Sequence, residues 1–303
     1  MTSQNVDLDC SLPQGSSLDP LKYILYASSL LELTGRFGVK IHSFADDTQL
    51  SKHLLVEDID SAKRDMASAI AAVSSWSRSY RLKLNAEQSE VIWLGTRQQL
   101  LKLSVTDKSL QLSDGQLRAA VTVRNLGVQI DEQMSFDSQS RSCAKACYYH
   151  LQRIRQIRKY VDDEVSEVLC TSRLDYCNSL YAYSSVSTRQ RLQHVQNCAA
   201  RLVADAPRRT SSRSLLHQLH WLSVEARITY KLCTLMYRIF NGTTPQYMAE
   251  LCQPCSNDRL RSSSHQDYVV PRTYKRLAEF IFCCGTYCME HFTGRILSHK
   301  LVL

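Results

Sequence analysis

Two adjacent aspartates, Asp46 and Asp47, stand between two short segments in which apolar and polar side chains alternate. Alternation with a period of two is typical of β-strands, so residues 39–44 and 48–52 predict a hairpin with the two carboxylates at its turn. Aspartate is disfavoured inside strands and favoured in turns, which argues against a buried structural role for both residues. Paired carboxylates at such a position can hold the metal ions of a phosphoryl-transfer site. The alternative is a solvated turn without a catalytic role.

The composition indicates a globular, basic chain. Hydrophobic residues make up 44% of the 303 positions, which is enough for one large or two modest cores. Lysine and arginine number 37 against 29 aspartates and glutamates, and the formal net charge of +8 suits a polyanionic partner. No apolar run of about 18 residues and no signal-peptide pattern occurs, so we expect no membrane insertion and an intracellular, cytoplasmic or nuclear location.

The chain up to about residue 130 has the mixed periodicity of an α+β region. Residues 57–80 place apolar side chains at steps of three or four, which predicts an amphipathic helix packed on a sheet. Residues 90–94 are predicted to form a further strand of that sheet. Asp114 and Gly115 offer a hairpin turn before a last stretch of strand at residues 121–130.

From Ser138 onward the apolar residues follow a helical spacing. Three stripes predict three helices, carried by Cys147, Leu151, Ile154, Ile157 and Val161, by Leu192, Val195, Cys198 and Leu202, and by Ile228, Leu232, Leu235, Met236 and Ile239. The second helix is expected to end before Pro207, while Ser223 caps the third and Asn241 ends it. Residues 253–266 are polar and serine-rich, which predicts a linker.

Basic residues and a glutamine lie on another face of the first of these helices, at Lys145, Gln152, Arg155 and Lys159. Lysine and arginine neutralise phosphates without reading bases, so this face predicts salt-sensitive, largely sequence-independent contact with a nucleic-acid backbone. A basic loop at Arg208, Arg209 and Arg213 is a candidate for a second phosphate contact. The alternative for the helical face is an ordinary solvated surface.

Twelve cysteines are scattered through apolar patterns, as at Cys147, Cys170, Cys198 and Cys233. This distribution favours reduced thiols in the core over a framework of disulfides. Cys252 and Cys255, followed by Cys284 and Cys288 with His265 between the pairs, have a loose zinc-ligand spacing. The pairs lack the glycines of a zinc knuckle, so structural zinc is the lesser alternative.

Four segments, taken in order, resemble motifs of reverse transcriptases of LINE-type (non-LTR), jockey-like retrotransposons. They are residues 12–21 (LPQGSSLDPL, similar to motif B), 44–47 (FADD, motif C), 82–95 (LKLNAEQSEVIWLG, motif D) and 123–131 (VRNLGVQID, the hairpin that follows). The resemblance runs from about Leu12 to about Glu279 and includes residues 219–224 and 241–247.

The resemblance implies an α+β fold, with a partial polymerase palm followed by an all-helical thumb and its extension. The palm is an antiparallel sheet with packed helices. On this basis residues 1–104 are expected to be the partial palm, 105–135 the hairpin after motif D, and 136–252 the thumb and extension. Residues 253–303 are expected to be a linker and a tail. Beyond Glu279 the resemblance stops, and we expect a frameshift near Phe280.

The resemblance also implies RNA-directed DNA synthesis with Mg²⁺. Asp46 and Asp47 correspond to catalytic and metal-binding carboxylates. The implied nucleotide- and template-binding positions are Pro13, Gln14, Gly15, Phe44, Ala45 and Gln88. An RNA template with a DNA primer, or an RNA–DNA hybrid, is the expected partner, and the sequence does not fix an oligomeric state.

Three departures from the family's pattern predict a chain that is inactive by itself. Only residues 1–10 precede motif B, so the motif A strand, which supplies another metal-binding carboxylate, and the fingers have no sequence to form them. The motif D lysine is replaced by Gln88, which cannot deliver a proton, and a motif B glycine by Asp19. The alternatives are a non-enzymatic nucleic-acid-binding remnant and an unstable gene product.

Overall fold

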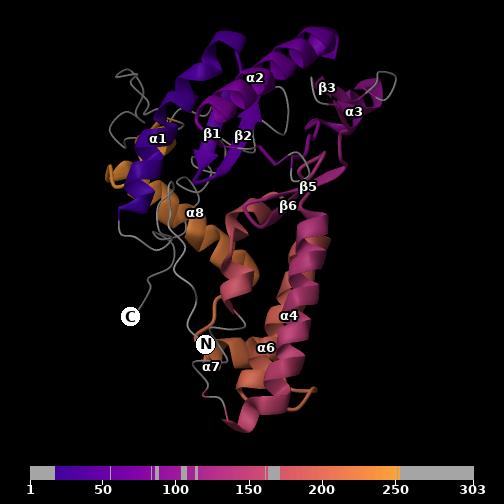
Figure 1. Ribbon diagram of the computed structural model, residues 1–303. Helices are drawn as coiled ribbons and strands as arrows, with labels where there is room; N and C mark the ends of the chain where they lie inside the picture. Colours follow the sequence, from indigo (N-terminus) through magenta and orange to yellow (C-terminus); the bar gives the residue numbers. More distant parts are fainter. Residues whose placement is uncertain are drawn as a thin grey trace, which may run out of the picture. The chain divides into compact units, whose positions relative to one another are not determined.

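The computed structural model describes residues 18–54, 56–82, 84–85, 89–103, 108–112, 115–160, 162, 171–250 and 252 (Figure 1). The described residues fall into two compact units. Unit 1 takes in those up to Trp93 together with Arg97–Leu126, and unit 2 takes in Leu94–Thr96 and those from Gly127 onward. Helices predominate over short strands, so the expected mixed α and β character is confirmed, whereas the names palm and thumb stay predictions.

Unit 1 contains helices and short antiparallel hairpins. Its elements are α1 (Asp19–Leu33), β1 (Lys40–Phe44), β2 (Asp47–Ser51), α2 (Ile59–Ser79), α3 (Arg97–Leu103), β3 (Leu110–Leu112), β4 (Gly115–Leu117) and β5 (Thr122–Asn125). The predicted hairpin and the predicted helix at 57–80 are therefore confirmed. β1 pairs with β2 from Lys40 opposite Ser51 to Phe44 opposite Asp47.

Helix α2 packs its apolar face against α1 and β3. Ile59, Ala62, Ala69 and Val73 are buried on that face, at the helical spacing seen in the sequence. The C-terminal end of α2 is tied to α1 by Trp76, whose Nε1 donates a hydrogen bond of 2.9 Å to Ser29 Oγ. Lys52, directly after β2, pairs with Asp65 of α2 at 2.5 Å and ties the hairpin to this helix.

The prediction of a strand at residues 90–94 is wrong. Val91 makes only an isolated parallel bridge with Ala119, and the strands of the described residues pair two by two, as β1–β2, β3–β4 and β5–β6 (Val128–Asp131). A strand needs a continuous partner, and pairing depends on distant residues that alternation within one segment does not specify. The expected hairpin before residue 121 is confirmed as β3–β4, with its turn outside the described residues.

Unit 2 is helical apart from β6. Its helices are α4 (Asp137–Ile157), α6 (Val186–Val203), α7 (Ser212–Gln218), α8 (Val224–Phe240) and α9 (Gln246–Ala249), with short 3₁₀ turns at Arg158–Tyr160 and Asn178–Tyr181. The predicted cap at the start of α8 is confirmed, because Ser223 Oγ accepts a hydrogen bond from Ala226 N. Gly242, directly after the Asn241 cap, has a φ of +63°. This left-handed conformation is common where helices end.

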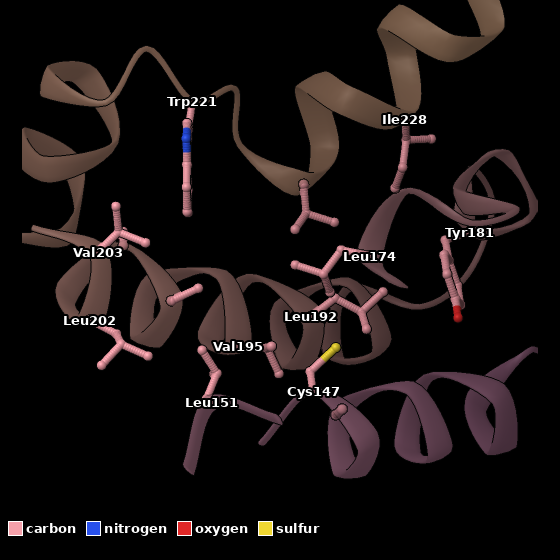
Figure 2. Packing of buried hydrophobic residues seen from close by; sticks show 14 of the residues in the cluster. Cys147, Leu151, Leu174, Tyr181, Leu192, Val195, Leu202, Val203, Trp221 and Ile228 are labelled. Atoms are coloured by element: carbon pink, nitrogen blue, oxygen red, sulfur yellow. The ribbon is translucent and has the colours of Figure 1, made fainter. Parts of the chain in front are cut away.

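The core of unit 2 is centred on α6. Figure 2 shows Leu192 and Val195 of α6 facing Cys147 and Leu151 of α4, with Trp221 on the opposite side of α6. α4 and α6 lie side by side (Figure 1) and run in the same direction, because Asp137 pairs with Arg191 at one end and Arg158 bonds to Leu202 at the other. None of the described helices is long and apolar enough to span a membrane.

Two residues of the predicted apolar stripes, Ile157 and Cys198, are exposed, while Leu235 and Ile239 of the third stripe are half-buried. Ile157 is 49% exposed at the last turn of α4. Cys198 is exposed, because α6 turns Ala199 and Ala200 inward beside it. The expectation of core thiols therefore holds for Cys147 and is wrong for Cys198. Val161 and Cys170 lie outside the described residues, as do the predicted zinc ligands other than Cys252 and the predicted linker and tail.

Candidate metal-binding turn and nucleic-acid interface

The β1–β2 hairpin closes through the two-residue loop Ala45–Asp46, because Phe44 pairs directly with Asp47. Ala45 has a φ of +52°, in the left-handed region that glycine enters at lower cost. Short hairpin loops require such a residue to match the twist of their strands. The loop therefore directs Asp46 outward at the cost of local backbone strain at Ala45.

All four side chains of the FADD segment are exposed, and that of Phe44 is 63% exposed. Across the hairpin, Ser43 Oγ and Thr48 Oγ1 lie 3.4 Å apart, within hydrogen-bonding distance. Asp46 acts electrostatically on Tyr23 of α1: partial burial raises the pKa of the Tyr23 hydroxyl, and the negative charge of Asp46 raises it further. Tyr23 thus lies within electrostatic reach of the candidate site, a neighbour that the sequence motifs do not single out.

The turn offers ligands of the right chemistry for magnesium, but few of them. Carboxylate oxygens are the hard donors that Mg²⁺ prefers. In the described ranges, however, no group of three histidine, cysteine, aspartate or glutamate side chains could hold a metal ion. Asp46 and Asp47 therefore fit magnesium by donor type, as two ligands from a single turn.

The predicted basic face of α4 is exposed at Lys145, Arg155 and Lys159. Aromatic side chains accompany these cations, with Tyr148, Tyr149 and Tyr160 being 44%, 54% and 88% exposed. Arg153 lies over the ring of Tyr149, 5.3 Å from its centroid. Cations and exposed rings together are the side chains that single-stranded nucleic acids contact through phosphates and bases.

The next arginine after this face has a structural role instead. Arg158 is half-buried, and its Nε and Nη2 donate hydrogen bonds of 3.2 and 2.8 Å to the carbonyl oxygens of Leu202 and Val203. Those carbonyls belong to the last turn of α6, where the usual amide donors four residues further along the helix are missing. A cation there is also favoured by the helix dipole. Sequence spacing did not reveal this contact, since it joins residues more than 40 positions apart.

Asp137 joins the N-terminal ends of α4 and α6. Its carboxylate accepts hydrogen bonds from Arg191, at 2.7 Å, and from Thr188, at 3.4 Å, and pairs with Arg141 at 2.5 Å. The hydrogen bond from Arg191 and the charges of both arginines hold the pKa of Asp137 below its usual value. Sequence reasoning missed this network, although an aspartate in the first turn of a helix was a visible signal.

Comparison with curated proteins gives 23% identity over 235 residues to a probable RNA-directed DNA polymerase from transposon BS of Drosophila melanogaster. The chain is distantly similar to a retrotransposon reverse transcriptase. The match covers 72% of this chain and 25% of that protein, so the chain spans about a quarter of the length of the curated relative. No protein-family model and no solved structure matches the chain.

The predicted site residues are thus distributed over both units. Phe44, Ala45, Asp46 and Asp47 lie together on the β1–β2 turn of unit 1. Lys145 and Arg155 lie on α4, Lys159 on the 3₁₀ turn after it, and Arg208 and Arg209 on the exposed loop before α7 of unit 2. Pro13, Gln14, Gly15 and Gln88 lie outside the described residues.

Proposed function

We propose that this chain is part of a retrotransposon reverse transcriptase, in which Asp46 and Asp47 supply carboxylates to the magnesium site. The observation that carries the proposal is the hairpin turn, which presents both acids of the FADD segment to solvent. The distant similarity to a transposon polymerase supports the same assignment. RNA templates, DNA primers and their hybrids are the partners that this function implies.

Magnesium bound in such a site neutralises charge on the attacking and leaving oxygens of phosphoryl transfer. The contribution of this chain is to hold two negative charges on a short, hydrogen-bonded hairpin. The pairing of Phe44 with Asp47 fixes the backbone of Asp47 at the start of β2. The left-handed conformation of Ala45 fixes the course of the loop that carries Asp46. Both carboxylates are thereby kept in one short segment as candidate ligands of the ion.

Metal binding at the turn can be tested by iron-directed cleavage. Fe²⁺ that replaces Mg²⁺ is oxidised by added hydrogen peroxide to Fe³⁺, hydroxide and a hydroxyl radical, and ascorbate regenerates Fe²⁺. The radicals cut the backbone near the ion, so cleavage is expected around residues 44–48 and should be suppressed by excess Mg²⁺. The double variant Asp46→Asn/Asp47→Asn should lose this cleavage. Glu57→Gln/Asp58→Asn changes another adjacent, exposed acid pair of unit 1 and should retain it. Cleavage that persists in the first variant would refute the proposed site.

We further propose that the 303-residue chain does not extend a primer by itself. Two-metal transfer takes carboxylates from more than one strand, and the two at this turn come from one hairpin. Groups that act as a unit lose orders of magnitude in rate when one is missing. Incubation with a primed RNA template, Mg²⁺ and nucleotides should give no product. Extension that Asp46→Ala abolishes would show that the chain is a complete enzyme.

A second candidate function, non-enzymatic binding of nucleic acid, is favoured by the exposed cations and tyrosines of α4. The triple variant Lys145→Gln/Arg155→Gln/Lys159→Gln should weaken binding to an RNA–DNA hybrid and reduce the salt slope by about 2 to 3. Lys22→Gln/Arg36→Gln/Lys40→Gln removes three exposed cations of unit 1 and serves as the matched control. If both triples have equal effects, binding follows net charge and not this face. Two results together would favour this candidate over the polymerase: Asp46→Ala binds nucleic acid as the unsubstituted chain does, and no iron-directed cleavage is found at the turn.

A further inference from the structure

An open cavity of about 570 Å³ lies on the surface of unit 2, beside the basic face of α4. It is lined by Tyr148 of α4, by side chains of α6 and by Ser212 of α7. The volume is in the range of small-molecule sites. Neither the FADD turn nor the predicted phosphate contacts line this cavity.

The lining of the cavity is cationic. Arg191, His194 and Arg201 line it, and no carboxylate among the described residues does. Arg191 is already paired with Asp137 at 2.7 Å, so its charge is partly neutralised. His194 is exposed one turn further along α6. The positive charge that an incoming anion would meet therefore comes mainly from Arg201.

Arg201 has donors that the described residues do not satisfy. Its Nη1 and Nη2 donate to the backbone carbonyls of Asn197, at 3.1 Å, and Thr210, at 3.4 Å. Its Nε is buried and has no hydrogen-bond partner in the part of the chain that the structure describes. A half-buried cation without a carboxylate partner is costly unless an anion or water completes its contacts. Because Arg201 lines the cavity, an anion there would offset part of this cost.

Neutral donors complete the set. Burial, together with the nearby Cys198, raises the pKa of the Tyr148 hydroxyl, so this group stays protonated at neutral pH and can donate. Ser212 provides another hydroxyl. The approach to the cavity is also basic along the sequence, since Lys145 lies one turn before Tyr148 and Arg213 directly follows Ser212. Arginine and hydroxyl donors around an acid-free cavity are typical of phosphate sites.

We propose that this cavity binds the phosphate of a nucleotide, either a nucleotide unit of a nucleic-acid strand or a free nucleotide. The volume exceeds the needs of an inorganic anion, and the half-exposed ring of Tyr148 offers a surface for a base. Binding of a nucleic-acid strand rests on the proposed function and would place one phosphate contact between α4 and the basic loop. Binding of a free nucleotide does not depend on the FADD turn.

The test uses the full chain with AMP and with a short fluorescein-labelled oligonucleotide as separate probes. Arg201→Gln should weaken binding at the cavity about tenfold, and His194→Gln should weaken it a few-fold, in line with the loss of charge-assisted contacts. Arg238→Gln removes an exposed arginine of α8 in the same unit and is the matched control. If Arg201→Gln unfolds, judged by circular dichroism, the exposed His194 decides the outcome.

Weakened binding of the oligonucleotide assigns the cavity to a strand, and weakened binding of AMP alone assigns it to a free nucleotide. Binding of neither probe, or equal losses in Arg238→Gln, would overturn the proposal. Arg201→Gln and His194→Gln should retain iron-directed cleavage around residues 44–48. A failure at the FADD turn is thereby separated from a failure at the cavity.

Discussion

At the scale of single residues, Ala45 combines a functional position with a strained backbone. Its φ of +52° costs an alanine roughly 1 to 2 kcal/mol. Strain of this kind persists where the surrounding structure demands it, which in this hairpin is the two-residue loop. The sequence predicted the turn and its exposed acids from local alternation. It could not predict the strain, because alanine is not a residue that marks left-handed turns.

The substitution Ala45→Gly should leave the free energy of unfolding unchanged or raise it by up to about 1 kcal/mol. Glycine relieves the left-handed strain, although it also increases the freedom of the unfolded chain. Ala71→Gly, at an exposed position inside α2, should lower the free energy by about 1 kcal/mol. Urea denaturation of both variants measures the contrast. Equal destabilisation would mean that Ala45 is not strained.

Asp137 should make stability depend on pH. Because its pKa is lower in the folded chain than in the unfolded one, its contribution is fully present above the unfolded pKa, about 3.9, and is lost as the pH falls through the folded pKa. Asp137→Asn should therefore cost about 0.5 to 1 kcal/mol at pH 7, the small value expected for a partly exposed network, and less near pH 3. Asp205→Asn alters an exposed aspartate of the same unit and is the control. A deficit that is constant with pH would contradict the assignment.

At the scale of elements, apolar spacing located α2, α4, α6 and α8 correctly, because each helix buries one face. It failed where a contact joins distant segments. The strand expected at residues 90–94 lacks a continuous partner, and Cys198 points away from the core into a cavity shared with Tyr148. The roles of Arg158 and Arg201 likewise depend on neighbours that only the packing of α4, α6 and α7 brings near.

Arg158 and Lys159 are adjacent cations with opposite expected effects. Arg158→Gln should lower the free energy of unfolding by about 1 to 3 kcal/mol, because it removes charged hydrogen bonds to the end of α6. Lys159 is exposed, so Lys159→Gln should change the free energy of unfolding by less than about 0.5 kcal/mol. It should weaken nucleic-acid binding. Thermal denaturation and binding titrations of both variants check this pairing. A reversed or shared pattern would refute the distinction between a helix-end contact and a phosphate contact.

At the scale of the whole molecule, the buried apolar residues are unevenly divided. The core cluster around α6 includes Leu192, Val195 and Trp221 and extends from Val128 to Ile228. The cluster described in unit 1 consists of Ile59, Leu100 and Leu103. Local stability follows the density of buried contacts, so amides in α4 and α6 should exchange with solvent more slowly than those of α1 and the β1–β2 hairpin.

Hydrogen exchange followed by mass spectrometry measures this difference peptide by peptide. Leu192→Ala leaves a cavity in the larger cluster and should cost about 2 to 5 kcal/mol, which accelerates exchange throughout α4 and α6. Leu100→Ala, in the smaller cluster, should accelerate exchange in α3 and leave α6 protected. Equal protection of α6 and the hairpin in the unsubstituted chain would contradict the prediction. The expected pattern instead gives the FADD turn the lower local stability, which would let the proposed metal site adjust to an ion, while the proposed phosphate cavity lies on the better-protected α6.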